Sequence, residues 1–199
     1  MGNSKNRIML GFQDAVKKYF AFLEDQYGFR CNYSDLYIVK FSSGKVFLNI
    51  YHERISYEIY IVIGILPENY NNQLKANLSD ILEMSGITNE RTFYQASNKN
   101  DIYVVIKKLS DLVRIYANDA LNGSIDYFKA ILEERIQRQQ NKLILQELKV
   151  AEKKANSAWD SKDYKKVVEI YYRFEKYLSL VQIKRLDYAK KMISEHMKD

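Results

Sequence analysis

Over residues 37–52 the chain alternates apolar and polar side chains with a period of two, and short turns at residues 43–44 and 53–54 separate these segments and a third one. Connections this short join antiparallel strands, so the pattern predicts a three-stranded meander. The third segment, residues 57–66, is apolar on both faces. It therefore predicts a central strand covered on both sides, which Pro67 ends because proline cannot continue a ladder.

The segments that flank this meander have the helical period instead. Apolar residues recur at steps of three and four over residues 7–27, 71–86 and 101–121, which predicts three amphipathic helices. Gly28 and Gly123 follow the first and the third, where glycine commonly ends a helix. Residues 92–96 fit either a short strand or a loop.

A longer helix is predicted to begin after Ser124 and to run to about residue 156. Unbroken, it would be ~50 Å long at ~1.5 Å per residue. Residues 137–142 are polar all round, as in a helix that bridges two packed bodies. Beyond it, helical spacing and a capping box from Ser179 to Gln182 predict a helical hairpin.

These elements predict an α+β fold. A small antiparallel β-meander with helices packed on it forms a body over residues 1–140, and the end of the long helix with the hairpin forms a helical module over residues 141–199. The spacing of Ala155, Ala158, Trp159, Asp163 and Tyr164 resembles a single helical hairpin of the tetratricopeptide type. That resemblance implies a packing role for Trp159.

Composition excludes several classes of site. The only cysteine, Cys31, rules out an intramolecular disulfide and a cysteine-based zinc site. His52 and His196 lack the spacing of metal ligands, and we expect neither a metal nor a cofactor. No apolar run reaches the ~18 residues of a membrane span, so we expect a cytoplasmic protein that does not contact a membrane.

Catalytic patterns are weak. Residues 42–45 contain a Gly-Lys pair, but they lie between two strands and lack the upstream glycine of a phosphate-binding loop. His52 is expected at a strand edge, with a general base beside Glu58 as the alternative. Asp35, Lys40 and Glu58 could be arranged as in a nuclease, yet their spacing is not a nuclease motif. We expect a protein that is not an enzyme.

The net charge of +6 is uneven along the chain. Residues 1–123 hold 14 Lys+Arg and 13 Asp+Glu, whereas residues 124–199 hold 17 and 12. Helical spacing places one mostly basic set on the outer face of the hairpin: Lys165, Lys166, Tyr172, Arg173 and Lys176. Such a face binds acidic protein surfaces or phosphate backbones, or is simply solvated.

The sequence resembles a group of small uncharacterised bacterial proteins of the immunity-protein type, found beside toxin genes. The resemblance lies in the meander and in residues 27–29, 52–54 and 58–64. The resemblance covers residues 12–130 and carries no catalytic residue. It implies a non-enzymatic factor, immunity- or antitoxin-like or acting in phage–host conflict, that occupies a partner protein's surface.

We expect this partner to be an acidic protein. The sheet residues Tyr37 and Tyr51 and the turn residue Arg54 are expected to contact it, together with the basic helical face. The alternative function is nucleic-acid binding by the basic helical module. The long helix also leaves a homodimer open.

Overall fold

The structure is a computed structural model that describes residues 7–66 and 74–195. Its contacts form two compact units, Met1–Arg135 and Ile136–Asp199, called here the N-terminal and C-terminal units. The sequence places its division near residue 140. The N-terminal unit combines a sheet with helices, whereas the C-terminal unit is helical.

An antiparallel sheet organises the N-terminal unit, with strand order β1-β2-β3-β4-β5 and β6 also paired with β4. Its strands are β1 (Arg30–Ser34), β2 (Ile38–Ser42), β3 (Val46–His52), β4 (Glu58–Ile65), β5 (Lys75–Asn77) and β6 (Tyr94–Gln95). The predicted meander is confirmed as β2-β3-β4. The short strands β5 and β6 pair with different parts of β4, at residues 62–64 and 58–59.

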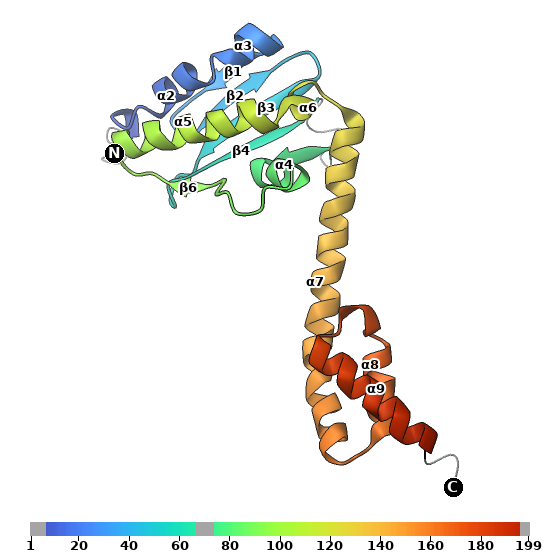
Figure 1. The fold of residues 1–199 in the computed structure, drawn as a ribbon. Coiled ribbons are helices and arrows are strands. Elements are labelled where there is room, and N and C mark those ends of the chain that lie inside the picture. Colours follow the sequence, from blue (N-terminus) through green and yellow to red (C-terminus); the bar gives the residue numbers. More distant parts are fainter. Residues whose placement is uncertain (1–6, 67–73, 196–199) are drawn as a thin grey trace. The chain divides into compact units, whose positions relative to one another are not determined.

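Helices cover one face of this sheet, where α2 and α5 pack against each other (Figure 1). The helices are α2 (Phe12–Tyr19), α3 (Phe22–Tyr27), α4 (Leu78–Met84), α5 (Lys99–Tyr116), α6 (Asn118–Leu121) and the first part of α7 (Ile125–Asp160). Gly28 and Gly123 have φ of 67° and 73°, which confirms glycine at these two helix ends. Arg135 of α7 donates to Asp80 at 2.7 Å and so ties α7 to α4.

Three helix predictions need correction. The single helix over residues 7–27 is wrong, because the chain breaks between α2 and α3, where the Tyr19 carbonyl accepts from Ser110 Oγ of α5 at 2.7 Å. The helix over residues 101–121 is divided at Ala117. Of the predicted helix over residues 71–86, residues 71–73 lie outside the described residues, as does Pro67, and residues 75–77 form β5 instead.

The prediction that the third strand is covered on both sides holds only in part. Ile59, Ile61 and Ile63 of β4 are fully buried, whereas Tyr60 and Val62 between them are only half-buried. The register pairs Tyr60 with Tyr51 of β3, so these side chains share the sheet face opposite the helix-covered one. We call it the second sheet face.

Gly64 on this face makes room for an aromatic ring. A Cβ atom at Gly64 would lie 2.6 Å from Phe47 Cε1 and 2.9 Å from the Cβ atom of Lys75. We expect Gly64→Ala to lower the free energy of unfolding by about 2 kcal/mol, because the ring must move off its neighbour. Denaturant unfolding followed by circular dichroism measures this change.

The matched control is Gly44→Ala in the turn between β2 and β3, where an added Cβ meets nothing within 4 Å. It is expected to change stability by less than ~0.5 kcal/mol. An equal loss in both variants would contradict the packing of Phe47 on Gly64.

The C-terminal unit consists of α7 from residue 136, α8 (Tyr164–Tyr172), the 3-10 turn η1 (Glu175–Tyr177) and α9 (Leu180–Glu195). Helix α7 is continuous through the polar residues 137–142. Ser179 and Gln182 exchange the two predicted capping hydrogen bonds at the start of α9, at 2.8 and 3.4 Å. The α+β fold with a long helix and C-terminal helices is therefore confirmed.

Small side chains let these three helices approach. The buried core is Ala155, Ala158, Val167, Tyr171, Leu186 and Ala189. Trp159 is half-buried against this core, and its ring centroid lies 6.0 Å from that of Tyr164 and 5.5 Å from that of Tyr188. The packing role expected for Trp159 is confirmed.

Candidate protein-binding site

The eight residues predicted to contact a partner lie in three places. Tyr37 and Arg54 meet at one rim of the sheet, with the guanidinium carbon 5.9 Å from the ring centroid. Tyr51 lies on the second sheet face. The remaining five, Lys165, Lys166, Tyr172, Arg173 and Lys176, lie on α8 or just after it and are all exposed.

The sheet does not present Tyr37 and Tyr51 together. Ile38 pairs with Tyr51, and His52 donates its backbone N–H to the Tyr37 carbonyl at 2.7 Å, so Tyr37 lies with His52 on the helix-covered side. Tyr51 instead stacks on Tyr60 with ring centroids 4.8 Å apart. Strand register therefore places the two tyrosines on opposite faces of the sheet.

The Tyr51–Tyr60 stack is held by polar contacts. Tyr60 donates its hydroxyl to Glu53 Oε1 at 2.7 Å, and Asn49 donates to the Tyr51 hydroxyl at 3.3 Å. Partial burial, followed by the contact with Glu53, raises the pKa of Tyr60 above its ordinary value. Both rings are therefore fixed and half-buried, with limited area left for a partner.

At the rim, the buried Arg7 side chain is bound to the turn that follows β3. Arg7 donates to the carbonyls of Glu53 and Arg54 at 2.8 and 2.6 Å. Its guanidinium carbon lies 4.0 Å from the centroid of the Tyr57 ring, a cation–π contact. Tyr57 has φ of 57°, an unusual value for an aromatic residue, in the turn that these contacts hold.

His52 belongs to the same cluster, and it lies at a strand end as expected, although not at an edge of the sheet. It ends β3, a central strand, and is 0% exposed. Because an arginine can only donate, His52 Nδ1 accepts from Arg7 at 3.2 Å, and Nε2–H donates to the Ala96 carbonyl at 3.0 Å. Burial, and then the Arg7 charge, lower the pKa of His52 to about 4. Both nitrogens are engaged, so the ring is not placed to act as a general base.

The other catalytic candidates, Glu58 and Asp35, make contacts of their own. Glu58 lines a cavity of about 350 Å³ with Tyr60, Ser79 and Phe93, but His52 does not. Asp35 accepts from the backbone N–H groups of Tyr37 and Ile38 at 2.7 and 2.8 Å, as a turn-forming side chain does. Among the described residues, no group of three or more His, Cys, Asp or Glu is placed to hold a metal ion.

The basic face of α8 lies where the sequence predicts it. Tyr172 is 63% exposed, with Lys190 Nζ 5.8 Å from its ring centroid. Arg173 pairs with Glu147 of α7 at 2.9 Å. Within residues 7–66 and 74–195, Lys165, Lys166 and Lys176 form no ion pair, so their charges face solvent.

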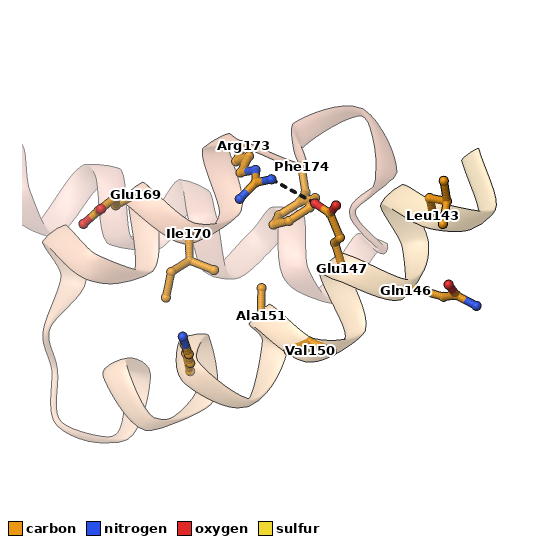
Figure 2. A pocket seen from close by; sticks show the side chains of 10 residues that line it. Leu143, Gln146, Glu147, Val150, Ala151, Glu169, Ile170, Arg173 and Phe174 are labelled. Atoms are coloured by element: carbon orange, nitrogen blue, oxygen red, sulfur yellow. Dashed lines mark hydrogen bonds and ion pairs between the residues drawn. The ribbon is translucent and has the colours of Figure 1, made fainter. Parts of the chain in front are cut away.

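Beside this face a groove of about 620 Å³ separates α7 from α8 (Figure 2). Ala151 and Ile170 point toward one another across it, and Phe174 lies farther along the α8 wall. On the α7 side Leu143 and Val150 line the groove and are 54% and 68% exposed. The remaining lining residues are Gln146, Glu147, Lys154, Glu169 and Arg173.

Sequence reasoning missed this groove, although a signal for it exists. From residue 143 onward α7 has more apolar residues than one buried stripe needs. Leu148 is buried, whereas Leu143 and Val150, seven residues apart and thus on one side of the helix, are exposed. The second set shows an apolar surface that the rest of the C-terminal unit does not cover.

No family model, no curated protein and no solved structure matches the chain. None of the helices in the described part of the chain is long and apolar enough to cross a bilayer. The roles of individual residues therefore follow from their contacts, exposure and charge.

Proposed function

We propose that this chain is a non-enzymatic factor that binds an acidic partner protein through its C-terminal unit. The observation that carries the proposal is the coincidence of charge and apolar surface. Residues 136–199 hold 15 Lys+Arg and 9 Asp+Glu, a net charge of +6 that equals the net charge of the whole chain. Residues 1–135 hold 16 of each and are neutral. The groove lies in this same unit.

Charge and apolar area have separate parts in such binding. Exposed lysines raise the rate at which an acidic surface is encountered and disfavour basic partners. Apolar side chains that become desolvated supply most of the affinity. Groove residues Leu143 and Val150 supply the apolar area, and Lys165, Lys166 and Lys176 supply the charge.

The N-terminal unit supports the non-enzymatic part of the proposal. Its buried histidine and its turn aspartate hold backbone groups in place, as described above. The more specific expectations, a toxin as the partner and a cytoplasmic location, stay predictions of the sequence.

Capture of partners from the cells that make the protein tests the proposed function. Tagged full chain is compared with a Lys165→Ala, Lys166→Ala, Lys176→Ala variant, with nuclease treatment and a salt series. We expect the wild type to retain one stoichiometric acidic protein and the variant to retain about tenfold less, since three favourable charges are lost.

The control removes the same charge from the N-terminal unit, as Lys17→Ala, Lys18→Ala and Lys99→Ala, three exposed positions on α2 and α5. It is expected to retain the partner as the wild type does. Equal loss in both variants would show a general charge effect and contradict the proposal. Recovery of nucleic acid that steeply declines with salt would favour the alternative function.

A further inference from the structure

The shape of the groove between α7 and α8 limits what can occupy it. Its lining runs from Leu143 to Lys154 on α7, which is ~16 Å, or three turns, at ~1.5 Å per residue. Both walls are helices, whose backbone N–H and C=O groups are already paired within the helix. An extended peptide would find no strand edge to pair with there, whereas a helix satisfies its own backbone.

The side chains of the groove fit the apolar stripe of such a helix. Ala151 of α7 and Ile170 of α8 face one another across the groove, Phe174 follows on the α8 side, and Leu143 and Val150 line the α7 side (Figure 2). Together these five side chains give the groove an apolar surface against which one helix can pack.

Charges flank the groove on both sides. On α7, Lys142, Lys149 and Lys153 follow the spacing i, i+7, i+11, which places them on one helix face next to groove residue Gln146. All three are exposed. On α8 the groove is bordered by the exposed basic face that contains Lys165 and Lys166.

Two of the ten lining residues are acidic and two, Lys154 and Arg173, are basic. Glu147 and Glu169 line the groove, and Glu147 is paired with Arg173. An occupant with carboxylates along both edges of its apolar stripe would therefore meet lysines on either side. A second copy of the C-terminal unit carries the same excess of positive charge and would be repelled.

Resting on the protein-binding function proposed above, we infer that the α7–α8 groove binds one amphipathic helix of the partner protein. This helix is about three turns long, with an apolar stripe that faces Ile170 and Phe174 and with acidic residues along its flanks.

Site-specific photo-crosslinking in cells tests the inference on the full chain. The benzophenone side chain of p-benzoylphenylalanine replaces Val150 in the groove or, as the control, Leu145, which is 50% exposed on α7 and does not line the groove. We expect Val150 to give a crosslink that mass spectrometry maps to a segment with helical apolar spacing and acidic flanks. The Leu145 position is expected to give none.

A synthetic peptide of the crosslinked segment then measures affinity by fluorescence anisotropy. We expect Leu143→Lys with Val150→Lys to weaken binding about tenfold or more, because two apolar contacts are lost. The added lysines would attract an acidic peptide. Weaker binding by this variant therefore measures the apolar contacts of the groove and not its charge. The control Leu145→Lys is expected to bind as the wild type or slightly tighter.

Several outcomes would overturn the inference: no crosslink from Val150, a crosslink to a second copy or to nucleic acid, or a crosslinked segment without helical apolar spacing. If the lysine-dependent capture of a protein persists in any of these cases, the proposed function stands and only the groove assignment fails. If that capture is lost as well, both fail.

Discussion

Arg7→Ala is expected to lower the free energy of unfolding of the N-terminal unit by about 3 kcal/mol. Arg7 is only 5% exposed. In place of water, its guanidinium group contacts two backbone carbonyls, one nitrogen of the His52 ring and the face of the Tyr57 ring. Hydrogen bonds from a charged donor contribute ~1.5–3 kcal/mol each, and part of that is offset by the cost of burying the charge. Alanine would also leave the turn around Tyr57 without the contact that holds its unusual backbone.

Hydrogen exchange of β3 and β4 measures this loss within the N-terminal unit. Fluorescence of Trp159, the only tryptophan, reports on the C-terminal unit and is expected to be unchanged.

Arg54→Ala is the matched control, since Arg54 lies at the same rim and near the same Tyr37 ring, but its own side chain is exposed. We expect this change to cost less than ~0.5 kcal/mol. If both variants lose the same stability, the contacts of the Arg7 side chain are not what stabilises the turn around Tyr57.

Stability of the N-terminal unit is also expected to fall by about 3 kcal/mol between pH 6.5 and pH 4 because of His52. Burial and the Arg7 charge lower the pKa of His52 from 6.5 to about 4, so in this range the unfolded chain binds a proton that the folded chain does not. The contribution of neutral His52 to stability is therefore complete above pH 6.5 and is lost as the pH falls. Below about pH 4 this loss is complete, and stability no longer changes because of His52. Its size follows from ~1.4 kcal/mol for each pKa unit.

His52→Gln provides the comparison for this pH dependence. The amide oxygen can accept from Arg7 and the amide nitrogen can donate to the Ala96 carbonyl, so the contacts have a replacement that does not titrate. Denaturant unfolding at a series of pH values is expected to show a flatter profile over this range for the variant. Parallel profiles for wild type and variant would mean that other groups cause the acid sensitivity.

How much of the candidate site follows from sequence can be judged from two groups of residues. The basic residues of α8 are exposed, as the sequence predicts. Helix geometry alone decides this, because residues three and four positions apart lie on the same side of a helix. The faces of the sheet residues do not follow from the sequence in this way. Tyr37 and Tyr51 have the same character in the sequence, but which face each occupies depends on how two strands align.

By itself, the sequence determined the class of the fold and several of its element ends. The period-two segments and their short turns determine β2, β3 and β4, and Gly28, Ser124 and the Ser179–Gln182 box set the ends of helices, because each acts through neighbours within a few residues.

Only the tertiary structure decided the features that join distant residues. The break between α2 and α3 depends on Ser110, the buried His52 depends on Arg7 and Ala96, and the groove depends on how far α8 stands from α7. Contacts across such separations are set when elements pack together. Local periodicity does not predict these contacts, since it indicates only which side of a helix or strand is apolar.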